Sequence, residues 1–221
     1  MNDDSVPPEH ALPIARLFPL PSLVLFPHGV QRLHIFEHRY RQMTAEAIAG
    51  DRQIAMVLLR PGWEPHYDDE PEIYPVACLG ELLDHERLPD GRYDLLLRGT
   101  QRIRILHEIE DDKRFRSAHY EAMPNLPAPE TLGVPDLRKR MAEAILPHFA
   151  NNPSARDQIT SLFESELPLG SLCDIVSFSM PMPLDFKQRL LEEPRTLSRV
   201  ISLIEYWHPQ GRRPTPGFSA N

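Results

Sequence analysis

The 221-residue sequence predicts an α+β fold in two parts, an antiparallel β-barrel with one short helix and an α-helical bundle after it. Three observations support this prediction. Short apolar segments of strand length follow one another in the first half of the chain. Apolar residues recur at helical spacing in the second half. The 24 prolines are absent from residues 28–60 and 90–123, which carry most of the predicted strands.

The first predicted element is an extended segment over residues 17–27, whose prolines exclude a helix because proline has no backbone N–H. Alternating apolar residues predict a strand over 30–36. From Glu37 the apolar spacing becomes helical, and Gly50 is a typical helix stop. A Pro-Asp-Gly sequence predicts a hairpin turn over 88–92. The other predicted strands cover residues 54–59, 76–83, 93–97, 101–106 and 115–123, with an interruption at Gly99 and Thr100.

Four prolines within residues 124–135 predict a linker between two domains. Beyond it, apolar residues recur at the spacing of helices that bury one face. The five predicted stripes are Leu137, Met141, Ala144, Ile145 and His148; Ile159, Leu162 and Phe163; Leu172, Ile175 and Val176; Phe186, Leu190 and Leu191; and Leu197, Val200, Ile201, Ile204 and Trp207. The predicted domains are therefore a β-barrel over 14–123 and a helical bundle over 136–208, with disordered tails over 1–13 and 209–221.

The composition excludes several classes of protein. A net charge of −8 argues against general binding to nucleic acids or anionic membranes, because phosphate affinity needs clustered basic residues. Two cysteines, Cys78 and Cys173, are too few for a disulfide framework or a four-cysteine zinc site. The acidic N-terminus does not resemble a signal peptide, and no apolar run is long enough to span a membrane. The sequence therefore predicts a cytoplasmic protein without a membrane segment.

No catalytic centre or cofactor site is predicted. The sequence contains no Gly-x-Ser-x-Gly elbow, and it has no Gly-Lys pair, which a nucleotide-binding P-loop requires. His28, His34 and His38 are close in sequence, but a zinc site needs three or four ligands and no acidic residue or cysteine completes this set. We therefore expect no metal. A hydrolase remains a third hypothesis, for which the sequence provides no paired nucleophile and base.

Two further segments leave alternatives open. Arg102 and Arg104 alternate with Ile103 and Ile105, which predicts arginines in solvent and isoleucines inside, although the arginines could instead contact an anion. The proline-rich loop over 63–75 carries several aromatic residues and few aliphatic ones. These rings either cover one end of the barrel or form a recognition surface, since aromatic residues are common anchors of protein interfaces.

Five motifs in order resemble the N-terminal substrate-binding domain of Lon proteases. They are Leu17-Phe18-Pro19-Leu20-Pro21, Val24-Leu25-Phe26-Pro27-His28, Leu33 to Tyr40, Leu88-Pro89-Asp90-Gly91-Arg92, and Arg98-Gly99-Thr100-Gln101-Arg102. The resemblance covers about residues 14–122 and extends more weakly to about residue 208. It implies a PUA-like pseudobarrel followed by helices, with Gly99 and Arg102 in structural roles.

The resemblance also implies a function. Lon proteases carry ATPase and protease modules after this domain, and this sequence contains neither, so we expect a stand-alone, non-catalytic module. Its expected ligand is unfolded polypeptide or a protein partner such as an ATP-dependent protease. The expected binding residues are Phe36, Tyr40, Trp63 and Tyr67, on apolar surface between the barrel and the helices. The alternative is a PUA-like protein that binds RNA or a small ligand, for which a continuous basic groove would be the sign.

Overall fold

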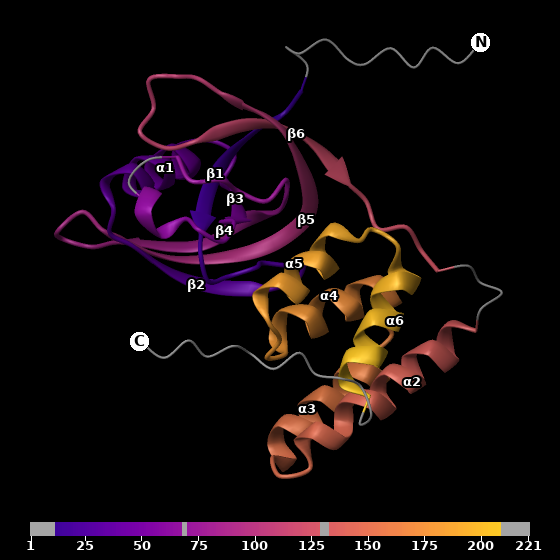
Figure 1. Ribbon diagram of the computed structural model, residues 1–221. Coiled ribbons are helices and arrows are strands. Elements are labelled where there is room, and N and C mark those ends of the chain that lie inside the picture. Colours follow the sequence, from indigo (N-terminus) through magenta and orange to yellow (C-terminus); the bar gives the residue numbers. More distant parts are fainter. Residues whose placement is uncertain (1–11, 68–69, 129–132, 209–221) are drawn as a thin grey trace, which may run out of the picture. The chain divides into compact units, whose positions relative to one another are not determined.

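The computed structural model of the chain describes residues 12–67, 70–128 and 133–208. The chain divides into two compact units between Pro124 and Asn125 (Figure 1). Of the tails predicted over 1–13 and 209–221, residues 1–11 and 209–221 lie outside the described residues. Leu12 and Pro13, predicted as part of a tail, instead meet the barrel, where the backbone N–H of Tyr120 donates to the carbonyl of Pro13. No helix among the described residues is long and apolar enough to cross a membrane.

Among its described residues, the barrel unit contains six strands, one α-helix and one short 3-10 helix. In order they are β1 (Ile14–Leu20), β2 (Val30–Ile35), α1 (His38–Ala49), β3 (Gln53–Leu58), η2 (Glu64–His66), β4 (Val76–Arg87), β5 (Tyr93–Ile109) and β6 (Ser117–Met123). The strand order is β2-β5-β4-β3-β1-β6, with an additional β5–β6 pairing that closes the sheet. The ring therefore contains five strands, and β2 is attached to the first half of β5.

One strand pair departs from the predicted antiparallel arrangement. β1 and β3 are parallel, with Leu17 opposite Ala55, whereas the other five pairings are antiparallel. A parallel pair needs a long crossover between its strands. Here β2 and α1 lie between β1 and β3 in the chain and supply it. The sheet is therefore mixed, and together with the helices of the second half it confirms the α+β prediction.

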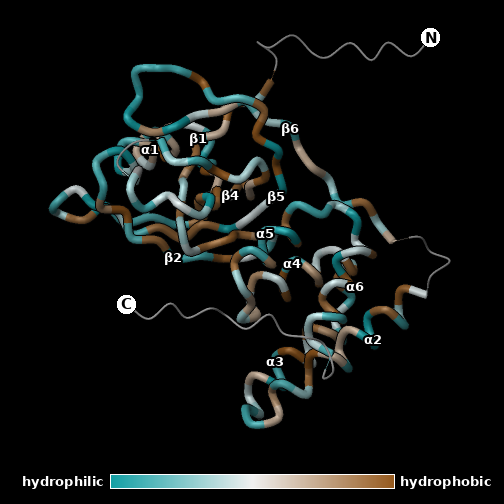
Figure 2. The backbone as a smooth tube through the Cα atoms, in the orientation of Figure 1, coloured by the Kyte–Doolittle hydropathy of each residue, from teal (hydrophilic) through white to brown (hydrophobic). Residues whose placement is uncertain are grey.

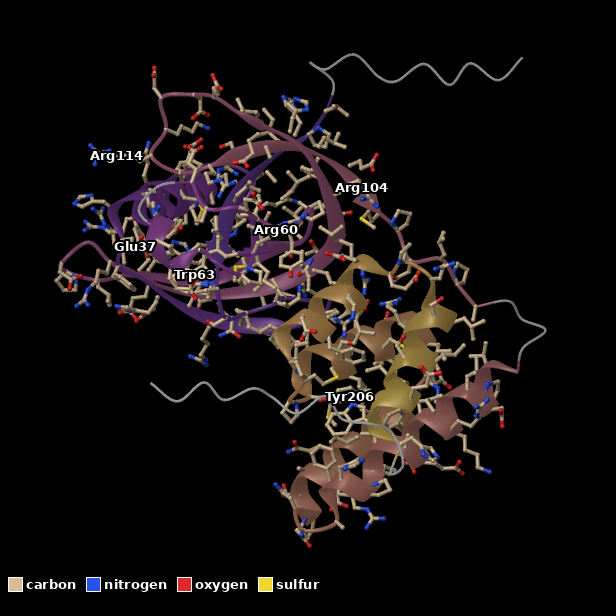
Figure 3. The ribbon with its side chains drawn as sticks, in the orientation of Figure 1. Glu37, Arg60, Trp63, Arg104, Arg114 and Tyr206 are labelled. Atoms are coloured by element: carbon tan, nitrogen blue, oxygen red, sulfur yellow. The ribbon has the colours of Figure 1, made fainter. Side chains whose placement is uncertain are left out.

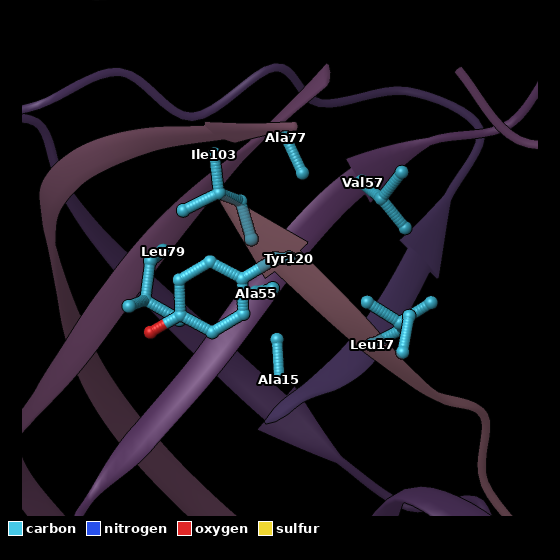
Figure 4. Packing of buried hydrophobic residues seen from close by; sticks show 9 residues of the cluster. Ala15, Leu17, Ala55, Val57, Ala77, Leu79, Ile103 and Tyr120 are labelled. Atoms are coloured by element: carbon cyan, nitrogen blue, oxygen red, sulfur yellow. The ribbon is translucent and has the colours of Figure 1, made fainter. Parts of the chain in front are cut away.

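The barrel interior is a cluster of small and medium apolar residues (Figure 4). Its members are Ala15, Leu17, Ala55, Val57, Ala77, Leu79, Ile103, Ala118 and Tyr120. The opposite face of β1, β3 and β4 is buried as well, since Phe18, Met56 and Cys78 are at most 5% exposed. Strands that are buried on both faces contain continuous apolar runs, which explains the unbroken apolar sequence of β3.

The prediction that Arg102 faces solvent is wrong. Its side chain is only 1% exposed, while Arg104 is exposed and pairs with Glu121 at 3.2 Å. The alternation rule assumes that only one face of a strand is covered. Arg102 lies opposite Cys78, on the second buried face of the barrel, so it and the neighbouring Ile103 are both inside.

β5 is one continuous strand of 17 residues, and the interruption predicted at Gly99 is a β-bulge. Gly80 lies opposite Gly99 and Leu79 lies opposite Gln101, so Thr100 is the extra residue. Glycine is required here because a Cβ on Gly99 would collide with the backbone carbonyl of Phe26. The bulge therefore lets the strand bend where the segment before β2 crosses it closely.

The described part of the helical unit contains five α-helices with one short 3-10 turn. They are α2 (Val134–Ile145), η4 (Leu146–Phe149), α3 (Pro153–Glu164), α4 (Leu169–Ser179), α5 (Leu184–Glu192) and α6 (Thr196–Trp207). Each predicted stripe lies on one of these helices. The stripe on α2 is buried as predicted, apart from His148, which lies beyond the helix and donates a hydrogen bond from Nε2 to the Trp207 carbonyl at 2.8 Å.

The buried face of α6 differs from the predicted one. The buried residues are Thr196, Arg199, Val200, Leu203 and Trp207, whereas the predicted Ile201 is 44% exposed. The cause is an ion pair between Arg199 and Asp174 of α4, whose side chains are both fully buried. Arg199 also donates to the Asn125 side chain at 2.9 Å. Turning Arg199 inward rotates Ile201 towards solvent.

Candidate functional site

The barrel unit contains a cleft of about 540 Å³, here called the Tyr40 cleft. Most of its lining comes from three segments, which are the start of α1, the loop after β3 and the turn between β5 and β6, and Pro19 of β1 completes it. That turn is strongly hydrophilic (Figure 2). The lining residues are Pro19, Arg39, Tyr40, Leu59, Tyr67, Glu70, Pro71, Glu108, Ile109, Glu110, Asp111, Lys113, Arg114, Phe115 and Arg116.

Glu37 organises one wall of the cleft from just before α1. Its carboxylate accepts a hydrogen bond from the Tyr67 hydroxyl at 2.7 Å and another from Arg39 Nε at 3.0 Å. The Arg39 guanidinium lies 4.8 Å from the centre of the Tyr40 ring and 5.1 Å from that of Tyr67, within the range of cation–π attraction. One carboxylate and one guanidinium therefore hold the two rings in fixed positions.

Both tyrosines are neutral at physiological pH. Burial raises the pKa of Tyr40, whose ring packs 4.5 Å from that of Phe18. Burial also raises the pKa of Tyr67, and the hydrogen bond to Glu37 adds to the effect. The two side chains therefore offer apolar ring surface and uncharged hydroxyl groups.

The opposite wall carries charges that are mostly paired with one another. Arg116 donates to both carboxylate oxygens of Glu108, from Nε at 2.6 Å and from Nη2 at 2.5 Å, and Arg116 Nη1 donates to the Pro71 carbonyl at 2.8 Å. Lys113 pairs with Glu46 of α1 at 2.8 Å. Among the lining residues, four are basic and four are acidic. The cleft is therefore not a basic groove.

The structure brings together three of the four predicted site residues. Tyr40 and Tyr67 line the Tyr40 cleft. Trp63 packs edge-on against Tyr67, with ring centres 5.5 Å apart, and lines an adjoining hollow of about 370 Å³ (Figure 3 labels Trp63 and Glu37). Glu70 and Pro71 line both hollows. Phe36 stands apart from the cleft and is 61% exposed.

The proline-rich loop over 63–75 thus folds back on the start of α1. Trp63 and Tyr67 remain partly exposed, so covering the barrel and presenting a surface are compatible roles for this loop. Sequence reasoning missed Glu37, Arg39 and Arg116 as parts of the site. Glu37 and Arg39 lie within the Leu33 to Tyr40 motif, which could have identified them as site residues. Arg116 lies in no motif that could have identified it.

The histidines near β2 lie apart from the cleft. His34 Nδ1 lies 2.6 Å from Asp94 Oδ1 on β5, and its ring is 6.4 Å from that of Phe36. His28 adopts a positive φ of 68° in the turn before β2. Within the described ranges, no three His, Cys, Asp or Glu side chains are grouped so that they could hold a metal ion.

Comparison with known proteins gives one consistent result. The family model for the ATP-dependent protease La (LON) substrate-binding domain matches residues 14–207. The chain is 26% identical to Lon protease of Azospirillum brasilense over 208 residues, covering 88% of this chain and 24% of that protein. It is 24% identical to Lon protease 2 of Myxococcus xanthus, covering 93% of this chain and 24% of that protein. The chain thus spans about a quarter of the length of these relatives.

Solved structures agree with this result at the level of the fold. The N-terminal domain of the Mycobacterium avium complex Lon protease superposes with a TM-score of 0.70 at 14% identity, covering 88% of this chain and 98% of that one. A Lon N-terminal domain protein from Xanthomonas campestris gives a TM-score of 0.61 at 20% identity, covering 90% and 100%. The family match over most of the chain confirms the resemblance, and the chain belongs to the Lon substrate-binding domain family.

Proposed function

We propose that the chain is a non-catalytic module that binds segments of unfolded polypeptide, or a protein partner, at the Tyr40 cleft and the adjoining Trp63 surface. One observation carries the proposal: fixed, neutral aromatic rings lie beside charges that are balanced within the lining. Such a surface suits polypeptides, because ring contacts accept many apolar side chains and the polar rim can serve backbone groups.

The proposal assigns recognition, and no chemical step, to these 221 residues. The family model that matches is a substrate-binding domain, and the sequence itself contains no Gly-Lys pair. We propose that ATP hydrolysis and proteolysis, if they are coupled to this recognition, are performed by a separate ATP-dependent protease in the cytoplasm. The PUA-like alternative, binding of RNA, is less favoured because the four basic lining residues are matched by four acidic ones.

The test is binding of a permanently unfolded protein, reduced and carboxymethylated α-lactalbumin, measured by fluorescence anisotropy. Trp63→Ala is expected to weaken binding about tenfold, since a truncated aromatic anchor costs more than about 1 kcal/mol. The matched control is Ile201→Ala, which removes an exposed apolar side chain from the helical unit and is expected to leave binding unchanged.

Circular dichroism of each variant verifies that the fold is retained. The proposal is abandoned if the wild-type protein binds no unfolded polypeptide, or if Trp63→Ala and Ile201→Ala bind as tightly as the wild type. Tighter binding of single-stranded RNA than of polypeptide would favour the alternative.

A further inference from the structure

β2 has an open edge. Among the described residues it pairs with β5 alone, because the ring closes through β5 and β6 without it. Edge strands present a row of unpaired backbone groups that another chain can extend. We propose that this edge binds an extended segment of another polypeptide as an additional strand. The proposal rests on the proposed function only in taking polypeptide as the ligand, and it concerns a different surface.

The pairing register shows which backbone groups face outward. The Gly99 N–H donates to the Gly29 carbonyl at 2.8 Å, and the Gly99 carbonyl accepts from the His28 N–H at 2.8 Å, so the Gly29 carbonyl faces β5. In an antiparallel ladder, hydrogen-bonded pairs alternate with pairs that point away. The backbone N–H and C=O groups of Val30, Arg32 and His34 therefore point away from β5. The Gln31 side-chain amide donates to the Arg32 carbonyl at 2.7 Å. This carbonyl points away from β5, and the N–H of an added strand could replace the Gln31 amide as its donor.

The geometry of these groups fits an extended chain. They repeat at every second residue along a six-residue strand, a length of about 20 Å. An added strand would give each outward N–H and C=O a partner at the same repeat, as in other complexes in which a peptide extends a sheet. A compact ligand would satisfy only one or two of them.

The side chains along this edge define the chemistry of the added strand. Val30, Arg32, His34 and Phe36 share one face, since they alternate along the chain and the rings of His34 and Phe36 stack. Val30 is 45% exposed and Phe36 is 61% exposed, so both ends of the edge are apolar. In the part of the chain that the structure describes, the exposed Arg32 between them forms no ion pair. The favoured ligand is therefore a strand with apolar residues at its ends and an acidic residue opposite Arg32.

The probe is a fluorescein-labelled peptide, Leu-Thr-Thr-Thr-Glu-Thr-Val. Added antiparallel to β2, it places its leucine opposite Phe36, its glutamate opposite Arg32 and its valine opposite Val30. Fluorescence anisotropy is expected to show saturable binding to the full chain. A peptide N-methylated at its third and fifth residues, whose amides face β2, is expected to bind at least about tenfold more weakly. Methylation of the fourth residue, whose amide faces solvent, is the matched control and is expected to leave binding unchanged.

Variants of the protein give a second test. Arg32→Pro removes an outward N–H that the β2–β5 ladder does not use, and edge strands tolerate such a proline. It is expected to lower peptide affinity at least about tenfold while circular dichroism is unchanged. Arg32→Gln keeps the N–H and removes the charge. It is expected to lose only the preference for the glutamate peptide over its glutamine counterpart. If Arg32→Pro does not fold, the comparison of the methylated peptides on the wild-type protein still tests whether a strand is added to β2.

The proposal is overturned if the two methylated peptides bind equally well, or if Arg32→Pro binds the peptide as the wild type does. It is also overturned if sedimentation shows that a second copy of the chain occupies the edge and the peptide does not displace it. Binding of unfolded α-lactalbumin that depends on Trp63 but not on Arg32 would leave the proposed function intact and remove only the β2 edge. If α-lactalbumin does not bind and the peptide still binds at β2, the proposed function is rejected and the β2 edge proposal is retained.

Discussion

The barrel unit and the helical unit treat paired charges differently. In the barrel unit, Arg116 and Glu108 pair at the rim of the Tyr40 cleft, where both side chains keep some exposure, and nine apolar residues fill the interior. In the helical unit, Arg199 and Asp174 pair at the centre with no exposed surface. Apolar burial tolerates substitution when volume is kept, whereas a buried ion pair fails when one partner is lost. Substitutions in the two units should therefore lower the free energy of unfolding for different reasons.

The largest effect is expected from Asp174→Ala, which leaves the Arg199 guanidinium buried without its carboxylate. We expect the free energy of unfolding of the helical unit to fall by about 3–5 kcal/mol. The chain has two tryptophans, one in each unit, so in a Trp63→Phe background the fluorescence of Trp207 reports urea unfolding of the helical unit alone.

The matched control for this experiment is Asp185→Ala, which breaks an exposed pair with Arg189 on α5. Its effect is expected to stay within about 0.5 kcal/mol. Equal effects of the two substitutions would show that the buried pair does not hold the unit together.

A smaller effect, confined to the barrel unit, is expected from Gly99→Ala. The new Cβ would lie 2.8 Å from the carbonyl carbon of Phe26 and 3.0 Å from Cys78 Sγ. Since backbone must move to admit it, we expect a loss of about 2–3 kcal/mol, measured by Trp63 fluorescence in a Trp207→Phe background. Gly62→Ala is the control: nothing lies within 4 Å of its Cβ, and only its φ of 91° opposes it, at a cost of about 1 kcal/mol. A Gly99→Ala loss no larger than that of Gly62→Ala would contradict the prediction.

The smallest effect is a difference in alkaline behaviour. Burial raises the pKa of Tyr40, so its contribution to barrel stability is complete below about pH 10, the value of an unfolded tyrosine, and is lost as the pH rises through the raised pKa. Burial lowers the pKa of Lys187 in the helical unit. The free energy of unfolding of this unit is therefore expected to increase as the pH rises towards the ordinary lysine pKa.

The measurement is urea unfolding between pH 8 and pH 11, with each tryptophan as the reporter of its own unit. The Tyr40→Phe variant is expected to flatten the alkaline decline of the barrel unit. A decline of equal slope in wild type and variant would assign it to other groups.

Local sequence patterns were enough to predict most elements of both units. The helix at α1, with its stop at Gly50, and the five later helices follow from apolar spacing and glycine or proline positions. The parallel pairing of β1 with β3 was not predictable in this way, because pairing direction depends on the path of the chain between the strands. The buried faces of Arg102 and Arg199 were missed for a related reason. Arg199 is paired with Asp174, which is distant in sequence, and Arg102 lies opposite Cys78 on a face that is buried.

The candidate site shows the same limit. Tyr40, Trp63 and Tyr67 were identifiable as aromatic residues in a motif or a sparse loop, and the structure places them around one cleft and its neighbour. Their arrangement depends on Glu37, which reaches across 30 positions of sequence to the Tyr67 hydroxyl. No periodicity encodes a contact of that kind. Whether these residues bind polypeptide stays a prediction for the α-lactalbumin experiment.

The anchoring of Asn125 and Leu126 has a mechanical consequence. These first residues of the helical unit follow Pro124 directly. Asn125 accepts a hydrogen bond from Arg199, and the backbone of Leu126 is hydrogen-bonded to Pro194 and Thr196 around the start of α6. A pull on the chain from the barrel side would therefore act on the Arg199–Asn125 hydrogen bond and on the backbone hydrogen bonds of Leu126 at the start of α6. A force applied to polypeptide bound by the barrel unit would reach the helical unit next to its buried Arg199–Asp174 ion pair.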